Sequence, residues 1–256
     1  MILLVADAHA HLADMDRVEE VIQRAAEAGV CAIASMGVGL QSNVETMRIA
    51  EKQWASAIKV FPCLGLHPWG LVEEDVEPAL TYIREHVGRA AGLGEVGLDY
   101  WLKEVKKDPS RKSLQRFAFE EALKMAKEYD KPITIHGRGA WEECYSLAVS
   151  MGVRKAIFHW YTGSIALLKQ VLDEGYYVSA TPALAYSKDH RAAIQEASLE
   201  NLLIETDAPV KYGLEASEPK DVLKTLVEVS KLKGVEMEQV ADKTLTNFSR
   251  LYQSSR

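Results

Sequence analysis

The sequence predicts a (β/α)8 barrel, and three observations support this prediction. Short apolar runs rich in β-branched residues or alanine alternate with longer segments whose apolar residues recur every three or four positions. Eight such runs fit into the 256 residues, with no Ser/Pro-rich linker or low-complexity block between them. Polar residues that bind metals follow several of the runs, which is where a barrel collects its functional side chains. We therefore expect one domain over residues 1–256.

The expected strands come first in each repeating unit, and helices connect them. The strands are predicted at residues 2–6, 32–36, 60–64, 90–94, 133–135, 155–158, 176–179 and 202–204. The helices are predicted at residues 18–28, 43–54, 76–86, 114–128, 141–150, 165–173 and 190–197, with two closing helices near 220–232 and 237–251. Gly29, Gly152 and Gly175 mark helix ends. An open doubly wound sheet is the alternative, but it normally has fewer strands, and no Gly-rich phosphate turn follows the first strand here.

Composition excludes several classes of protein. A formal net charge of -7 argues against a surface coated with positive potential, so extended binding to duplex DNA is not expected. The three cysteines, Cys31, Cys63 and Cys144, form no close-spaced pair and are expected to be buried small hydrophobic residues. The apolar start of the chain meets Asp7 too early for a signal peptide or a membrane span, so we expect a cytoplasmic protein with no membrane association.

Six candidate metal ligands follow the predicted strands in a fixed order. They are His9, His11, Glu95, His136, His159 and Asp207. In an extended segment, two residues separated by one position point to the same side, so the first two imidazoles are placed to share an ion. A His-x-His pair is weak evidence alone, but coincidence would have to repeat on five strands. His86 and His190 lie in helical patterns instead and are expected at the surface.

Several longer motifs make the sequence resemble the TatD-type deoxyribonucleases, metal-dependent hydrolases within the broader amidohydrolase group. The motifs are Asp7-x-His9-x-His11, Gly65-Leu66-His67-Pro68, Gly94-Glu95-Val96-Gly97-Leu98-Asp99-Tyr100, Gln115-Arg116-x-x-Phe119, His136-x-Arg138, His159-x-x-x-Gly163-Ser164, Glu205-Thr206-Asp207-Ala208-Pro209 and Thr246-Asn247-Phe248. Two segments depart from the family pattern: Trp160-Tyr161-Thr162 replaces smaller residues, and residues 214–219 lack an Arg-Asn pair. These departures bear on substrate preference rather than on metal binding.

The resemblance implies two divalent metal ions, with zinc, magnesium and manganese as candidates. It implies that His9, His11 and Asp207 hold one ion, that His136 and His159 hold the second, and that Glu95 bridges the two. It also implies that His67 and Arg138 face the substrate. The catalytic residues are then expected to be Asp207, Glu95, His67 and Arg138.

The expected reaction is hydrolysis by metal-activated water. Two bound ions can share a water and stabilise charge on the attacking and leaving oxygens of a phosphodiester. No Gly-x-Ser-x-Gly motif supplies a protein nucleophile, and Asp207 is the expected proton acceptor. Glu205 is expected to contact a metal-binding side chain rather than the ion itself.

The expected substrate is a single-stranded or frayed DNA end, and no obligate protein partner is evident. Bases would stack on aromatic residues, and phosphates would meet cationic ones. The aromatic candidates are Trp69, Trp101, Trp141, Trp160, Tyr100 and Tyr161, and the cationic candidates are Arg138, Lys103 and Lys211. Two alternatives stay open: a hydrolase or deaminase for a small ester, lactone or amide, and a binding protein that keeps the barrel without catalysis.

Overall fold

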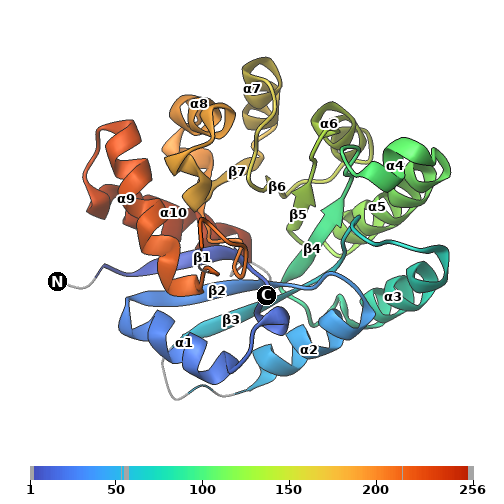
Figure 1. The fold of residues 1–256 in the computed structure, drawn as a ribbon, viewed down its shortest axis with the longest axis horizontal. Coiled ribbons are helices and arrows are strands. Elements are labelled where there is room, and N and C mark those ends of the chain that lie inside the picture. Colours follow the sequence, from blue (N-terminus) through green and yellow to red (C-terminus); the bar gives the residue numbers. More distant parts are fainter. Residues whose placement is uncertain (1–2, 53, 55–57, 215, 253–256) are drawn as a thin grey trace.

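Eight parallel strands, paired in chain order from β1 to β8, form the centre of the molecule, and helices surround them (Figure 1). The computed structural model describes residues 3–52, 54, 58–214 and 216–252. The strands are β1 (Val5–Ala10), β2 (Val30–Met36), β3 (Lys59–Leu66), β4 (Gly92–Gly97), β5 (Ile133–His136), β6 (Ala156–Phe158), β7 (Tyr177–Ala180) and β8 (Leu202–Ile204). This arrangement is a (β/α)8 barrel, as the sequence predicts.

The helices return the chain from the end of one strand to the start of the next, as parallel pairing requires. They are α1 (Val18–Glu27), α2 (Leu40–Glu51), α3 (Glu73–His86), α4 (Lys103–Lys107), α5 (Ser110–Glu128), α6 (Trp141–Ser150), α7 (Ile165–Asp173), α8 (Lys188–Glu196), α9 (Val222–Lys233) and α10 (Met237–Tyr252). Four short 3₁₀ turns lie at Leu12–Asp14, Pro182–Ala185, Leu199–Asn201 and Pro219–Asp221. Among the described helices, none is both long and apolar enough to cross a membrane.

Several predicted boundaries need correction. The first strand is Val5–Ala10 rather than residues 2–6, and residues 1 and 2 lie outside the described part of the chain. Strand β4 begins and ends later than predicted, so Glu95 lies within it rather than after it. Helix α2 ends at Glu51 instead of continuing to Trp54, and α4 was not predicted.

Barrel closure depends on contacts between the first and last strands. The His11 amide donates to Ala208 O at 2.7 Å, and the Asp207 amide donates to His9 O at 2.9 Å. Behind them, Asp7 accepts hydrogen bonds from the Thr206 amide at 3.0 Å and from the Thr206 hydroxyl at 2.6 Å. We call this set of contacts the seam. It brings residues from opposite ends of the chain to one place.

The apolar core has two parts. The larger part lies between the strands and the helices around them. The smaller part joins small strand residues such as Ala32 and Ala34 to Phe248 and Tyr252 of α10. Phe61 packs edge-on against Phe248 with ring centroids 5.2 Å apart. The small strand side chains leave room for these aromatic rings, so the last helix completes the core.

Candidate metal and catalytic site

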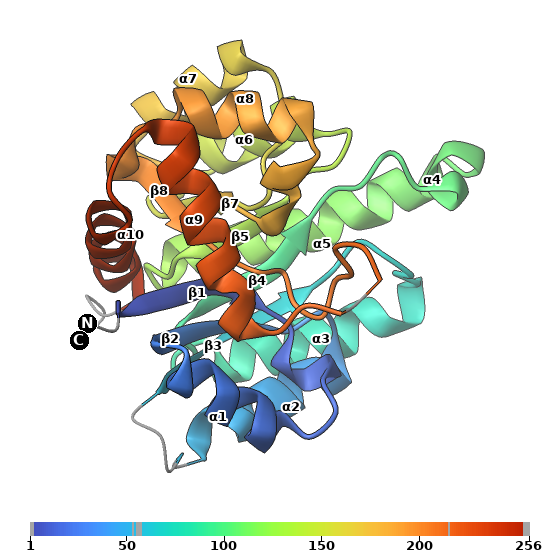
Figure 2. The same cartoon turned by 60° about the vertical axis from the view of Figure 1, so that its left-hand side comes forward.

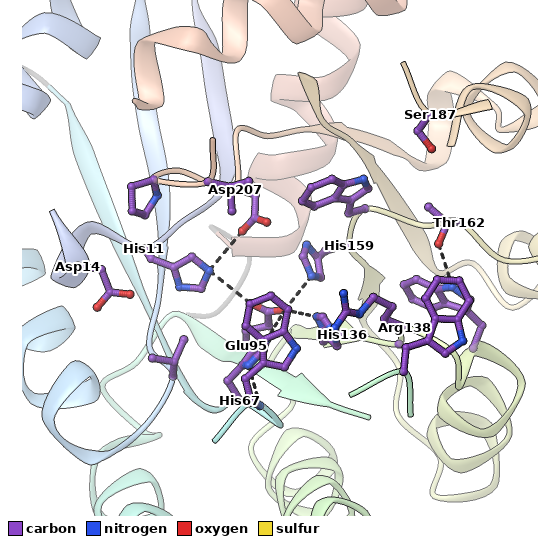
Figure 3. A pocket seen from close by; sticks show the side chains of 18 of the residues that line it. His11, Asp14, His67, Glu95, His136, Arg138, His159, Thr162, Ser187 and Asp207 are labelled. Carbon is purple, nitrogen blue, oxygen red and sulfur yellow. Dashed lines mark hydrogen bonds and ion pairs between the residues drawn. The ribbon is translucent and has the colours of Figure 1, made fainter. Parts of the chain in front are cut away.

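All six predicted ligands lie together where the strands end. Figure 3 shows the five of them that line the cavity, which are all except His9. Their total exposures range from 0 to 9%, so each imidazole and carboxylate is largely removed from water. Buried charged groups are stable only when they are paired or bound to a cation. They come from five strands or the residues that follow them: His9 and His11, Glu95, His136, His159 and Asp207.

Four ligand atoms converge at the seam. The Nε2 atoms of His9 and His11 are 3.1 Å apart. They lie 3.2 and 3.3 Å from Glu95 Oε2, and 3.4 and 3.3 Å from Asp207 Oδ1. Tetrahedral coordination with bonds of about 2.0–2.1 Å separates ligand atoms by about 3.3 Å. These four residues therefore fit a divalent cation by both donor chemistry and spacing.

The other oxygen of Glu95 faces three different imidazoles. Glu95 Oε1 lies 2.8 Å from His136 Nδ1, 2.8 Å from His159 Nε2 and 3.1 Å from His67 Nε2. One carboxylate therefore presents each of its oxygens to a separate group of histidines. A bridge between two cations has this geometry.

Buried carboxylates fix the rings of two of these histidines. His136 Nε2 lies 3.0 Å from Asp99 Oδ2, and His159 Nδ1 lies 3.3 Å from Glu205 Oε1. A carboxylate acceptor keeps the ring proton on the nitrogen that faces it, which is Nε2 in His136 and Nδ1 in His159. Histidines that bind metals commonly have such an acceptor on the ring nitrogen that does not bind the ion. The inner nitrogens then present lone pairs toward Glu95, which is favourable only with a proton or a cation between them. This second position also fits a cation.

His67 has the opposite orientation. The Trp69 amide donates to His67 Nδ1 at 3.0 Å, so that nitrogen carries the lone pair. In a neutral ring the proton is then on Nε2, which faces Glu95 at 3.1 Å. Burial lowers the pKa of His67 more than Glu95 raises it, which favours the neutral ring. His67 is therefore arranged as a hydrogen-bond donor, although its position near Glu95 and His136 also satisfies the distances of a ligand group.

The pKa shifts in the cluster indicate that positive charge stabilises its buried carboxylates. Burial alone would raise the pKa of Glu95, but the imidazoles of His67, His159 and His9 outweigh it and hold that pKa well below the usual value. Burial would lower the pKa of His11, but hydrogen bonds to Asp207 and Glu95 raise it to about 10. The pKa values of His136 and His159 are raised as well, by hydrogen bonds and charge from nearby carboxylates that outweigh burial, so without another cation protons on His11, His136 and His159 balance the carboxylates. Metal binding at such sites releases these protons.

Close backbone packing brings β3, β4 and β5 together around these ligands. A Cβ atom at Gly65 would overlap the backbone of Glu95, and a Cβ atom at Gly97 would overlap the carbonyl of His136. Asp207 adopts a φ of +52° and Trp160 a φ of +44°, in the left-handed region that non-glycine residues rarely use. Strain of this kind is concentrated at functional sites.

A cavity of about 700 Å³ opens beside the ligands. Trp69, Trp101, Trp141 and Trp160 all line it, as does Arg138, and Tyr186 adds an aromatic side chain that the sequence did not single out. The two predicted tyrosines are absent from this wall. Tyr161 is fully buried and donates to Ser164 O at 2.8 Å, and the Tyr100 hydroxyl donates to Glu143.

The predicted phosphate contacts of Lys103 and Lys211 stay a prediction, whereas the predicted surface position of His190 is corrected. Lys103 and Lys211 are exposed but do not line the cavity. His190 is fully buried rather than at the surface. Its Nδ1 donates to Tyr161 O at 2.9 Å and its Nε2 accepts from the Thr181 amide at 3.1 Å, so it joins the loops after β6 and β7.

Asp99 is the functional residue that sequence reasoning missed. It is fully buried, and its Oδ2 lies 3.0 Å from His136 Nε2, 2.8 Å from Arg138 Nε and 2.6 Å from Trp69 Nε1. Burial would raise its pKa, but hydrogen bonds from His136, Trp69 and Arg138 and the charge of His136 outweigh this effect and lower the pKa to about 2. Its position within the Gly94–Tyr100 motif was the feature of the sequence from which its role could have been predicted.

Comparisons with known proteins find relatives along nearly the whole chain. A family model described as TatD related DNase matches residues 6–253. A metal-dependent hydrolase from Methanocaldococcus jannaschii is 28% identical over 96% of both chains, and human deoxyribonuclease TATDN3 is 27% identical over 98% of this chain and 96% of its own. The crystal structure of an Escherichia coli TatD homologue, YJJV, superposes with a TM-score of 0.86 at 23% identity over 99% of both chains, which supports the fold.

Proposed function

The chain belongs to the TatD related DNase family and is a metal-dependent hydrolase, and on that premise we propose that it is a two-metal phosphodiesterase acting on DNA. It removes nucleotides from single-stranded or frayed DNA ends. The observation that carries this proposal is the division of Glu95 between two histidine groups, with Oε2 facing His9 and His11 and Oε1 facing His136 and His159.

The proposed ligand sets follow from the orientation of each ring. His9, His11 and Asp207 hold one ion, His136 and His159 hold the other, and Glu95 binds both. His67 stays outside the second set, because a neutral ring whose Nδ1 accepts the Trp69 amide has no lone pair left on Nε2. The donors are nitrogen and oxygen atoms, which suits zinc and manganese and allows magnesium.

The protein groups around the ions have separate tasks. When bound, the ions lower the pKa of a shared water and stabilise the charge on the reacting oxygens. Asp207 would serve as the proton acceptor, because it is the proposed ligand carboxylate on the cavity wall that does not face both groups of histidines. His67 and Arg138 line the cavity and face the phosphate, with the His67 Nε2 proton held by Glu95 and the guanidinium of Arg138 binding the phosphate oxygens.

The shape of the cavity supports a strand end as substrate. Four tryptophans offer faces for unpaired bases, and stacking of this kind tolerates any base sequence. Trp69 and Trp101 are 54% and 60% exposed, so they remain accessible to a ligand. The net charge of -7 disfavours attraction along a long duplex, whereas a short contact at an end is less affected.

A degradation assay tests the proposal. Protein loaded with zinc, manganese or magnesium is incubated with end-labelled single-stranded DNA, with the same sequence as a closed single-stranded circle, and with a blunt duplex. We expect stepwise shortening of the linear strand, slower loss from the duplex and an intact circle. An intact linear strand, with two ions bound per chain, overturns the nuclease proposal. Hydrolysis of small esters, lactones or amides in parallel reactions would then identify the other substrate class.

A further inference from the structure

A basic segment projects from the barrel next to the cavity. Residues 101–112, which we call the α4 arm, contain α4 and the start of α5, and Figure 2 shows them extending beyond the neighbouring loops. The arm carries five Lys or Arg residues against Glu104 and Asp108, a net charge of +3 in a chain of net charge -7. The arm therefore differs in charge from the protein as a whole.

The lysines of α4 have no counterion. Lys103, Lys106 and Lys107 are exposed, and none of their ammonium groups has an ion-pair or hydrogen-bond partner within the described part of the chain. Many other lysines do: Lys124 pairs with Glu121, and Lys231 pairs with Glu228, each on its own helix. Three adjacent unpaired ammonium groups repel one another, and a polyanion relieves that repulsion.

Local contacts hold the arm in place. Val105 is only 2% exposed and anchors α4 to the protein. The Lys106 amide donates to Leu102 O at 3.0 Å. Asp108 accepts hydrogen bonds from both the amide and the hydroxyl of Ser110, at 3.0 and 2.6 Å, where α5 begins. The three lysines therefore extend from an ordered turn.

The arm begins at the wall of the cavity. Trp101 lines the cavity and is 60% exposed, and Lys103 follows it by two residues. The Trp101 ring lies so close to Gly139 that any Cβ there would overlap it. The Trp101 amide donates to Asp99 Oδ1 at 3.0 Å, so the same buried carboxylate that contacts His136 and Arg138 also fixes the base of the arm.

From these observations, we infer that the α4 arm binds the phosphodiester backbone of a single nucleic-acid strand whose end occupies the cavity. This inference rests on the proposed function and extends it to nucleotides away from the cleaved bond. An exposed aromatic ring beside unpaired cations is the combination that binds single strands without reading their sequence. The negative charge elsewhere on the protein would repel the strand, so the arm also sets the direction in which it leaves.

Removing the arm's charge tests the inference. The variant carries Lys103→Gln, Lys106→Gln and Lys107→Gln. A matched control carries Lys59→Gln, Lys127→Gln and Lys169→Gln, which remove the same charge from exposed lysines on other elements. Binding to a fluorescent 12-nucleotide phosphorothioate strand, which resists hydrolysis, is measured by anisotropy at several salt concentrations. The KM values for an ordinary 12-nucleotide strand and for a dinucleotide are measured alongside.

We expect the arm variant to bind the 12-nucleotide strand about tenfold more weakly. The slope of log binding constant against log salt concentration should fall in magnitude by about 0.7 for each phosphate that the arm no longer neutralises. Its KM for the dinucleotide and its kcat should equal those of the control variant. Equal affinity and salt slope in both variants would overturn the inference while leaving the nuclease intact. If the unaltered protein degrades neither substrate, the proposed function fails and the inference fails with it. Arm-dependent binding to anionic lipid vesicles, with no binding to the strand, would also overturn it.

Discussion

The two halves of the ligand cluster differ in what holds them. At the seam, His9, His11 and Asp207 are fixed by backbone hydrogen bonds between the first and last strands. On the cavity side, His136 is fixed by Asp99, which also holds the exposed side chains of Trp69 and Arg138. One half is thus set by the fold, whereas the other is linked through Asp99 to side chains of the cavity wall that are partly exposed.

Removing the carboxylate shared by both halves should have the largest effect. Glu95→Gln takes away the charge that faces both histidine groups. We expect hydrolysis to fall on the order of 10³-fold or more, the scale of loss seen when a group acting at the reacting atoms is removed. Bound metal, measured by elemental analysis, should fall below two ions per chain. Glu143→Gln, which alters a hydrogen-bond partner of Tyr100 and Arg116, is the control. It should keep both the hydrolytic activity and the bound metal of the unaltered protein. Retention of activity and of both ions by Glu95→Gln would contradict the bridging role.

Asp99→Asn should separate the cavity half from the seam half. The carboxylate behind His136 is lost, and such changes cost about 10–100-fold in metal affinity or activity. Metal titration should show one weakened site and one unchanged site. Because Trp69 and Arg138 lose the same partner, KM should also rise. If both metal sites weaken equally, the two halves are not independent.

Asp7→Asn, at the seam, should lower stability rather than metal affinity or kcat. Asp7 is as buried as Asp99, but its oxygens accept from Thr206 and the His9 amide rather than from a metal-binding ring. Burial raises the pKa of Asp7 well above its usual value, against these hydrogen bonds. We expect a loss of about 1–3 kcal/mol in the free energy of unfolding, the usual cost of an impaired buried hydrogen bond. Denaturant unfolding measures this loss, and kcat at saturating metal should stay within about threefold. A collapse of kcat with unchanged stability would assign Asp7 to catalysis.

The last expected effect is confined to low pH and concerns the neutral side chain of His190. Burial lowers its pKa to about 4, so the folded protein keeps this ring neutral where the unfolded chain, with an ordinary pKa near 6.5, takes up a proton. The unfolded state therefore gains protons first as the pH falls, and stability is lost from about pH 6.5 downward. Between pH 7 and 5 this contribution amounts to about 2 kcal/mol.

The variant His190→Gln isolates that contribution. The amide can keep one of the hydrogen bonds to Tyr161 or Thr181 but has no proton to gain in this range. Its unfolding free energy, measured at pH 7, 6 and 5, should decline less steeply than that of the unaltered protein. Parallel declines would show that His190 does not contribute to the pH dependence.

Sequence reasoning succeeded where local signals were strong. The ranges predicted for α6, α7 and β8 agree with the observed bounds, and the helix-ending Gly152 and Gly175 have φ of +73° and +77°. The first strand was misplaced because its second half is polar. Asp7 and His9 are fully buried there by neighbours that are distant in the chain, and local hydropathy does not register such neighbours.

The grouping of the six candidate residues was predictable from the sequence, but the contacts that support them were not. The six residues were identified by their positions at strand ends, and the structure brings all six together. The importance of Asp99 depends on where Trp69, His136 and Arg138 turn their side chains, which spacing along the chain does not reveal. The burial of His190 likewise depends on two loops meeting around it.

The seam also determines when this protein can become active during its synthesis. Asp7 and Thr206 are 199 residues apart, and the ligands on either side of them belong to the first and last strands. A ribosome must therefore release nearly the whole polypeptide before the first ion position has all of its ligands. A cation bound there would be coordinated by residues of β1 and by Asp207 after β8, and would therefore hold the first and last strands together. Emerging chains should consequently lack hydrolase activity until β8 has been synthesised and has docked against β1.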